Sequence, residues 1–256
     1  MQSLYIFYCY IIPLIALIFI PGLILSYLCK ILGKDRLANR IINSLAFVWM
    51  KIFLISTGRK LEFIPGDLNL DDKKRFLICN HTNSLEVPFV VSIPLLSHNA
   101  NAKLSYLGGD IIDRYWIIPL MMHARIVNAV KYSDKNPNFR NFKADVMNTL
   151  KSASIFLFPE GKRTYSEDIQ PLKTGVLKIA YKFNIDLDVF VISGLMGYSS
   201  SFEYSKIRNN KKILFKYCGS LKSSDFKDFE SMRIATENLM TREKQILDRI
   251  LEEGEA

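Results

Sequence analysis

Apolar positions form one long uninterrupted segment at the start of the chain and shorter runs after it. Residues 1–29 contain no charged side chain, and residues 4–28 are long and apolar enough to cross a hydrocarbon core about 30 Å thick. This pattern predicts a transmembrane helix over residues 4–28. Pro13 and Pro21 would kink it, so a re-entrant helix in one leaflet is also consistent. A cleaved signal peptide is disfavoured because no cationic region precedes the apolar run.

A second segment, residues 40–56, has a helical period. At 100° per residue, polar and apolar side chains separate onto two faces. The polar face carries Arg36, Arg40, Asn43, Ser44 and Lys51, and the apolar face carries Ile42, Leu45, Val48, Trp49, Ile52 and Phe53. One interpretation is an interfacial helix whose cations face phosphate headgroups. The other is a helix that packs its apolar face on a folded domain.

Cations follow the first apolar segment and none precedes it. Lys30, Lys34, Arg36 and Arg40 come directly after it. Positive residues favour the cytoplasmic side of a membrane segment, so we expect the rest of the chain in the cytoplasm. The sequence thus predicts a membrane anchor over residues 1–58 and a folded domain over residues 59–256, held at the membrane and facing the cytoplasm.

Short apolar runs alternate with helical periods in the remainder of the chain. Strands are predicted over residues 76–79, 103–107, 126–130, 154–158, 188–193 and 212–217, and helices over 86–93, 114–123, 139–152, 172–183 and 226–252. This alternation is typical of an α/β domain whose helices cover the faces of a sheet. The last helix carries charges on most faces, so we expect it outside the central core.

The net charge of +9 indicates an anionic partner. No nucleic-acid-binding module is recognisable, so no nucleic acid is expected, and an anionic membrane surface together with an anionic substrate explains the charge. The four cysteines include no CxxC pair, which is typical of reduced thiols in a cytosolic domain. The three histidines include no pair with metal-ligand spacing, so no metal site is expected.

The first chemical motif, Asn80-His81-Thr82-Asn83-Ser84-Leu85-Glu86, follows the predicted strand 76–79 directly. A histidine can take a proton from an alcohol if a carboxylate holds its other ring nitrogen. A turn from strand into helix would allow His81 and Glu86 to form this pair. No G-x-S-x-G signature is present, so the attacking hydroxyl would belong to a substrate. Alternatively, His81 only caps or satisfies the hydrogen-bonding groups of a turn. Glu86 would then be a carboxylate in the first turn of a helix, where the helix dipole favours a negative charge.

The second motif, Phe158-Pro159-Glu160-Gly161-Lys162-Arg163-Thr164, follows another apolar run. A glycine turn presents backbone N–H groups, and an arginine grips phosphate through two parallel hydrogen bonds. Glu160 could orient a glycerol-like hydroxyl or hold Arg163. The alternative is a polar turn with solvated charges.

Together, about eighty residues apart, the two motifs resemble those of the glycerolipid acyltransferases typified by 1-acylglycerol-3-phosphate acyltransferase. That family carries N-H-x-x-x-x-D and F-P-E-G-T-R-S motifs, and Glu86 stands where it usually has aspartate. The likeness extends from about residue 75 to residue 194. It implies a central mixed sheet flanked by helices, with N-terminal membrane helices before the catalytic domain.

The resemblance also implies a reaction and a site. His81 would deprotonate a lysophospholipid hydroxyl, with Glu86 orienting it, and the acyl donor would be acyl-CoA or acyl-carrier protein. The acceptor would be 1-acyl-glycerol-3-phosphate, giving phosphatidic acid, and no bound cofactor or metal is implied. The implied substrate-binding residues are Asn80, Lys103, Glu160, Gly161, Lys162 and Arg163. A G-x-x-F-x-x-R block of the family aligns with residues 123–129 without its arginine, so Arg125 or Lys131 would substitute.

Two alternatives share this fold. A thioesterase or phospholipid hydrolase would use water as the acceptor. A catalytically degenerate member would bind lipid or a partner protein without turnover, and the glutamate at position 86 and the missing arginine favour it.

Overall fold

The structure is a computed structural model that describes residues 12–57, 60–69, 74–81, 104–108, 129–131, 139–161, 168–194 and 212–253. Its elements are α2 (Ile12–Ile31), α3 (Asp35–Thr57), β1 (Lys60–Ile64), β2 (Phe76–Cys79), β3 (Leu104–Gly108), β4 (Ala129–Lys131), α6 (Phe139–Thr149), β5 (Ser154–Leu157), α7 (Thr174–Lys182), β6 (Leu187–Ser193), β7 (Lys212–Leu221), the 3-10 helix η5 (Ser223–Asp225) and α8 (Phe229–Glu253).

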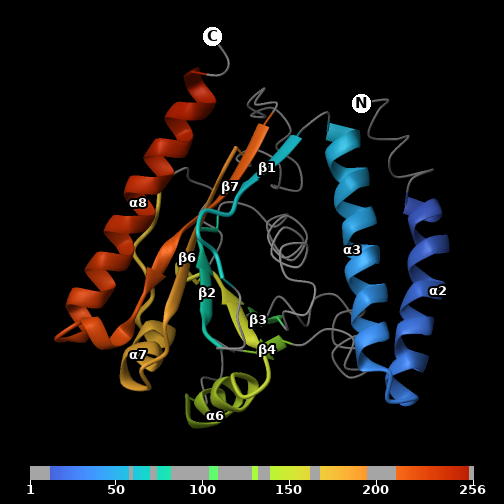
Figure 1. Ribbon diagram of the computed structural model, residues 1–256, viewed down its shortest axis with the longest axis horizontal. Coiled ribbons are helices and arrows are strands. Elements are labelled where there is room, and N and C mark those ends of the chain that lie inside the picture. Colours follow the sequence, from blue (N-terminus) through green and yellow to red (C-terminus); the bar gives the residue numbers. More distant parts are fainter. Residues whose placement is uncertain are drawn as a thin grey trace.

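The seven strands among these residues form one sheet in the order β1-β7-β6-β2-β5-β3-β4 (Figure 1). All neighbouring pairs are parallel except β6 and β7. The expected α/β fold with a mixed sheet is therefore confirmed. Because β6, β2, β5, β3 and β4 run in the same direction, the residues that follow them meet at one edge of the sheet.

The predicted strands agree with the structure, with small shifts at their ends. The largest shifts are at β4, which begins at Ala129, and at β7, which continues to Leu221. The sequence did not predict β1, an edge strand in which Lys60 and Glu62 are exposed. The predicted helices over residues 86–93 and 114–123 lie outside the described residues.

Helices α6, α7 and α8 cover one face of the sheet (Figure 1). The prediction that the last helix lies outside the core was wrong. Its side chains Met232, Met240, Leu247 and Leu251 are buried in the main hydrophobic cluster. Their spacing of 8, 7 and 4 residues places them in one stripe, so a helix rich in charge still contributes a narrow apolar face to the core.

The other face of the sheet carries a second cluster, which includes Phe156, Phe190 and Phe215. Leu54 of α3 is buried in this cluster, so the C-terminal end of α3 packs on the domain. Helix α2 packs beside α3 (Figure 1). A Cβ placed on Gly22 would lie 2.7 Å from the Cδ1 atom of Leu45, so the two helices approach closely there.

The amphipathic segment was expected over residues 40–56, and the helix that contains it, α3, extends over Asp35–Thr57. Of the apolar face given above, Leu45 is buried, and it lies where α2 approaches α3. Leu54, which was not assigned to that face, is buried against the sheet. On the polar face, Arg40, Ser44 and Lys51 are exposed, as predicted.

Helix α2 begins at Ile12 and ends at Ile31, and residues 1–11 lie outside the described residues. Searched over the described residues, no helix has both the length and the apolar content needed to cross a membrane.

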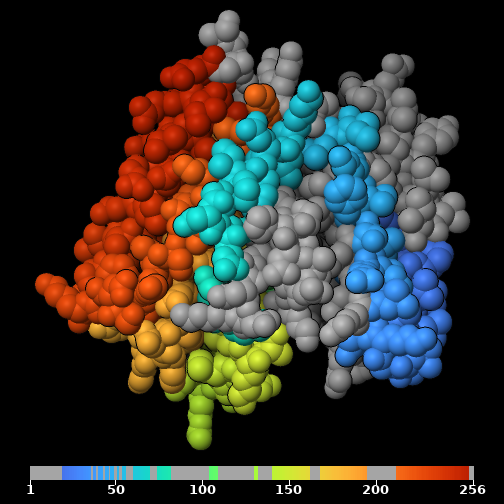
Figure 2. Space-filling model, viewed as in Figure 1, coloured from blue at the N-terminus to red at the C-terminus, as the bar shows by residue number. Residues whose placement is uncertain are grey.

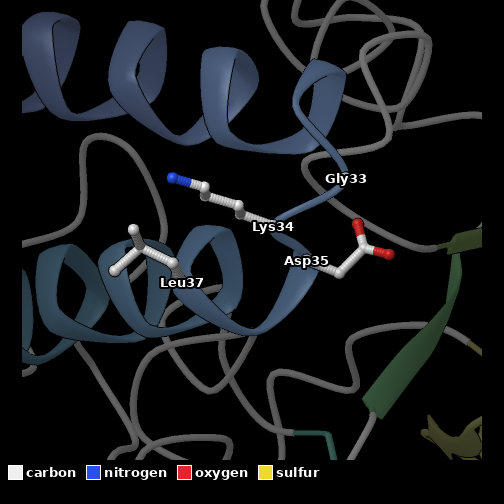
Figure 3. A pocket seen from close by; sticks show the side chains of 4 residues that line it. All are labelled: Gly33, Lys34, Asp35 and Leu37. Carbon is white, nitrogen blue, oxygen red and sulfur yellow. The ribbon is translucent and has the colours of Figure 1, made fainter.

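Apolar side chains are exposed along α2 and at the turn that follows it. They are Ile20, Ile24, Leu25, Leu28, Ile31 and Leu32. Figure 2 shows that α2 and α3 form the side of the molecule opposite α8. A solvent-open hollow of about 410 Å³ lies at the α2–α3 turn, lined by Gly33, Lys34, Asp35 and Leu37 (Figure 3). None of these four residues belongs to either motif.

Candidate active site

The two chemical motifs meet at the edge where parallel strands end. Strands β2 and β5 are neighbours, with Ile78 opposite Leu157, so the residues that follow them lie next to each other. The backbone N–H of His81 donates a hydrogen bond to Glu160 Oε1 at 2.7 Å. Residues separated by 79 positions in the sequence are thus in direct contact.

Glu160 links two segments of backbone. Its other carboxylate oxygen, Oε2, accepts the backbone N–H of Gln170 at 2.9 Å. Glu160 is buried, with only 3% of the residue's surface exposed. Hydrogen bonds from N–H groups to an ionised carboxylate are stronger than those between neutral groups. Glu160 therefore holds the position of His81 relative to the segment that leads into α7.

The His81 ring stacks on the ring of Phe158. Their centroids lie 4.0 Å apart, and the ring planes differ by 18°. Phe158 in turn meets Phe156 edge to face, with centroids 5.3 Å apart. Stacking restrains the plane of the imidazole, whose two nitrogens lie at the edge of the ring. A base with a fixed direction is what proton abstraction requires.

Asn80 fixes the residue before the histidine. It is buried, and its side-chain Nδ2 donates to the carbonyl of Ile192 at 3.0 Å, while its Oδ1 accepts the Ile192 N–H at 2.8 Å. The amide thus pairs with β6 as a further strand residue would. His81 is held through Asn80 on the β6 side and through Glu160 on the β5 side.

Gly161 forms a tight turn after Glu160. Its N–H donates to the carbonyl of Phe158 at 3.0 Å, and its φ of +71° lies in the left-handed region that favours glycine. A Cβ on this residue would also lie 2.5 Å from Lys173 Cδ. The backbone conformation therefore favours glycine at this position, and a larger residue would also have to displace the flexible Lys173 side chain.

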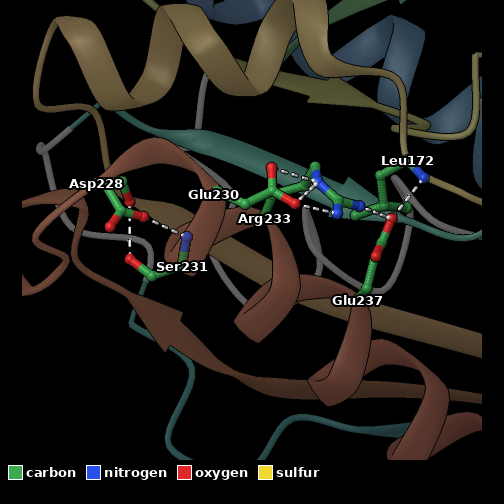
Figure 4. Close-up of polar contacts among 6 residues, drawn as sticks. All are labelled: Leu172, Asp228, Glu230, Ser231, Arg233 and Glu237. Carbon is green, nitrogen blue, oxygen red and sulfur yellow. Dashed lines mark hydrogen bonds and ion pairs between the residues drawn. The ribbon is translucent and has the colours of Figure 1, made fainter.

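Helix α8 contacts the segment that leads from the second motif into α7. Glu237 accepts the backbone N–H of Leu172 at 2.9 Å and pairs with Arg233 at 2.7 Å, and Arg233 also pairs with Glu230 (Figure 4). The segment between the second motif and α7 is thus held by two carboxylates, Glu160 and Glu237.

A buried ion pair lies near the opposite end of β2. Arg75 Nη1 contacts Asp188 Oδ1 at 3.1 Å, and the Tyr217 hydroxyl donates to the same oxygen at 3.4 Å. Burial raises the pKa of Asp188 above its usual range, although the charge of Arg75 and its hydrogen bond act in the opposite direction. Burial and the charge of Asp188 raise the pKa of Tyr217 as well.

The chain is similar to known proteins in sequence and fold. A model of the Acyltransferase family matches residues 60–195, which include both motifs. The chain belongs to this family. The resemblance of its motifs to glycerolipid acyltransferases is thereby confirmed.

Two curated relatives of this acyltransferase-family chain are similar in sequence. It is 25% identical over 182 residues to the 1-acyl-sn-glycerol-3-phosphate acyltransferase of Saccharomyces cerevisiae, covering 67% of this chain and 54% of the relative. It is 23% identical over 156 residues to a probable 1-acyl-sn-glycerol-3-phosphate acyltransferase of Mycoplasma pneumoniae, covering 59% of this chain and 56% of the relative. The chain thus spans a little over half the length of the curated relatives it matches.

A solved structure shares the fold of this family member. The crystal structure of the 1-acyl-sn-glycerophosphate (LPA) acyltransferase PlsC from Thermotoga maritima superimposes with a TM-score of 0.71 at 17% sequence identity, covering 96% of this chain and 94% of that chain. This similarity supports the α/β fold assigned above.

The remaining predicted site residues of this acyltransferase-family chain are partly placed. Lys131 is exposed at the end of β4, on the same edge of the sheet as His81 but three strands away. The others lie outside the described residues: Glu86, Lys103, Arg125, Lys162 and Arg163. Where the structure describes side chains, no three His, Cys, Asp or Glu residues gather in a cluster that could hold a metal ion.

Sequence reasoning did not anticipate three residues that support His81. Phe158 belongs to the second motif, so its position directly after a strand was a usable signal for the stacking contact. Gln170 and Ile192 contribute only backbone groups to Glu160 and Asn80. No side-chain pattern could have indicated them, because any residue type supplies the same N–H and C=O.

Proposed function

We propose that this protein transfers a fatty acyl group from acyl-CoA or acyl-carrier protein to a hydroxyl of a lysophospholipid. The proposed acceptor is 1-acyl-glycerol-3-phosphate, which would give phosphatidic acid. The observation that carries the proposal is the placement of His81, stacked on Phe158 and bonded through its backbone to Glu160, at the edge where parallel strands end. Family membership and the names of both curated relatives support the same reaction.

In the proposed reaction His81 acts as the general base. It takes the proton from the acceptor hydroxyl as the oxygen attacks the thioester carbonyl carbon, so that a C–O bond forms. The C–S bond then breaks, and the imidazolium returns the proton to the leaving thiolate. The products are the ester and the free thiol. Glu86 would orient the ring and stabilise the imidazolium, as carboxylates do in other histidine-based sites.

Binding of the acceptor would rely on cations that follow strands in the sequence. Lys162 and Arg163 follow the glycine turn at Gly161, and Lys131 lies at the end of β4. The phosphate of a lysophospholipid is the group that such cations select, and the positive net charge of +9 favours its approach. The reaction needs no metal or bound cofactor in this proposal.

We also propose that the protein works at a membrane surface, with residues 1–58 as the anchor and residues 59–256 as a catalytic domain facing the cytoplasm. The exposed apolar side chains of α2 support this location, because they follow one another along one helix, and contiguous apolar patches mark interaction surfaces. The acceptor and the acyl product are themselves membrane lipids, so the site must lie close to the bilayer.

The test is acyl transfer by purified protein in detergent. A radiolabelled palmitoyl or oleoyl thioester is offered with lysophosphatidate and a panel of other lysophospholipids. His81→Ala is expected to lower kcat by about 10²- to 10⁴-fold, the usual contribution of a general base. His98→Ala, a histidine outside both motifs, serves as the matched control and should retain activity.

Other outcomes identify the alternatives. Release of free fatty acid without any acceptor requirement would assign a hydrolase. Lysophospholipid binding without turnover, unchanged by His81→Ala, would assign a binding protein and overturn the proposal.

A further inference from the structure

We propose that Glu160 is a positioning residue that acts on the reaction through the backbone of His81 and not through contact with the acceptor. The inference rests on the proposed function, in which His81 is the base. It assigns to the second motif a part in placing the base, in addition to the phosphate binding expected of its cations.

The contacts of the carboxylate carry this inference. Oε1 accepts the His81 N–H at 2.7 Å and Oε2 accepts the Gln170 N–H at 2.9 Å, so each oxygen holds one short bond to backbone. Only 3% of the residue is exposed, which leaves little surface for a substrate hydroxyl. A group that contacts the acceptor directly would have to present its oxygens to the substrate.

The two bonds also couple the base to the substrate-binding segment. Gln170 lies ten residues beyond Glu160, so the bond between them brings together the two ends of the segment that contains Lys162 and Arg163. The bond to His81 attaches this closed segment to the end of β2. One side chain thus sets the position of the base relative to the residues proposed to hold the phosphate.

This role predicts a specific kinetic signature. Loss of the Glu160 bonds would allow the His81 backbone to shift, and a displacement of about 1 Å at a reacting group costs on the order of 100-fold in rate. The loss should therefore fall on kcat, while the KM for the acceptor changes by less than about threefold. A carboxylate that bound the acceptor would instead raise KM when removed.

The kinetic arm compares three variants. Glu160→Gln keeps the size of the side chain but replaces one carboxylate oxygen with an NH₂ group. This NH₂ group faces one of the two backbone N–H donors, and because two donors cannot bond to each other, one hydrogen bond is lost. Glu160→Asp keeps the charge but shortens the reach by one methylene. The matched control is Glu237→Gln, which alters a carboxylate bonded to the backbone of the same segment at Leu172 but not to His81. Both Glu160 variants should lose kcat, and the control should retain most of it.

A spectroscopic arm is independent of activity. The chain has three histidines, so selective ¹⁵N-histidine labelling of the backbone gives three amide signals, and His81→Gln identifies the one from His81. An N–H bonded to a carboxylate at short distance resonates downfield. Glu160→Gln should move this signal upfield, and Glu237→Gln should leave it in place.

The two arms separate the possible failures. An unmoved His81 amide signal in Glu160→Gln, or a rise in acceptor KM at constant kcat, overturns the positioning role. If the wild-type protein shows no acyl transfer, the proposed function fails, and the Glu160–His81 hydrogen bond then has no role in catalysis. The amide signal still tests whether Glu160 holds His81 in that case. Circular dichroism confirms that each variant is folded, and Glu160→Asp replaces Glu160→Gln in both arms if the latter does not fold.

Discussion

The side-chain amide of Asn80 continues the hydrogen bonding between β2 and β6 by one step beyond β2. Both groups that it pairs with belong to the Ile192 backbone, and all of these atoms are buried. Replacing Asn80 with alanine leaves an N–H and a C=O of Ile192 without these partners. We expect the free energy of unfolding to fall by about 2 kcal/mol, measured by urea denaturation. Asn238→Ala, at an exposed position on α8, is the control and should change it by less than about 0.5 kcal/mol.

The Arg75–Asp188 pair predicts a pH-dependent stability. The pKa of Asp188 is raised by burial, so the folded state binds more protons than the unfolded state between the two pKa values. Stability therefore falls as pH rises through this interval. Arg75→Met removes the cation that lowers the pKa of Asp188, so this fall should be larger and extend to higher pH.

Urea denaturation at pH 5 and pH 8 measures the effect. The difference in unfolding free energy between wild type and Arg75→Met should be greater at pH 8 than at pH 5, because a larger rise in the pKa of Asp188 makes stability fall over a wider pH interval. Equal differences at both pH values would show that Arg75 contributes packing and not charge. Asp225 is exposed, so Asp225→Asn provides a control that should show no such trend.

At the scale of single residues, the motifs in the sequence indicated candidate site residues but not the groups that these residues contact. His81 and Glu160 were recognisable from the motifs, and the structure brings them into contact. Their contact, however, depends on the register of β2 against β5, which places Ile78 opposite Leu157. A sequence pattern indicates that two strands exist, whereas their order and register are set by packing across the whole sheet.

Among the elements, the α2–α3 pair offers a matched test of helix packing. Gly22 and Gly175 both lie in helices, yet a Cβ on Gly22 would lie 2.7 Å from Leu45 Cδ1, whereas a Cβ on Gly175 would meet nothing within 4 Å. Gly→Ala in the middle of a helix normally stabilises by about 0.5–1 kcal/mol, and the gain is smaller at Gly175, the second residue of α7. Gly175→Ala should therefore raise the thermal unfolding temperature, and Gly22→Ala should raise it less or lower it, because Leu45 must move. Equal gains would show that Leu45 adapts without cost.

The elements also show where the apolar pattern of the sequence predicts secondary structure correctly and where it does not. Strands such as β2 and β5 are fully buried runs of four residues and were recognisable as continuous apolar segments. Strand β1 alternates exposed and half-buried positions over only five residues, which gives too short a pattern to distinguish from a loop. The last helix was predicted to lie outside the core because it carries many charges. Its narrow apolar stripe was overlooked, although such a stripe decides where a helix packs.

Among the side chains that the structure describes, large exposed apolar ones are more frequent on α2 than on α8, and this difference provides a test of the proposed membrane location. Ile24 and Leu28 on α2 are 55% and 48% exposed, one helical turn apart. Ile234 and Ile250 are 44% and 47% exposed. They belong to α8, which lies on the side of the molecule opposite α2 (Figure 2). Insertion of two half-exposed side chains into a bilayer contributes about 2 kcal/mol, or about thirtyfold in partitioning.

The measurement is flotation with vesicles of phosphatidylcholine alone and of phosphatidylcholine mixed with phosphatidylglycerol. The double variant Ile24→Ser/Leu28→Ser should bind both vesicle types about thirtyfold more weakly than wild type, while Ile234→Ser/Ile250→Ser should bind as wild type. The net charge of +9 should add a contribution seen only with phosphatidylglycerol and reduced by salt in every variant. If both double variants bind equally, α2 is not the contact surface. If salt removes all binding of the wild type, charge alone holds the protein at the membrane, and the apolar side chains of α2 do not enter it.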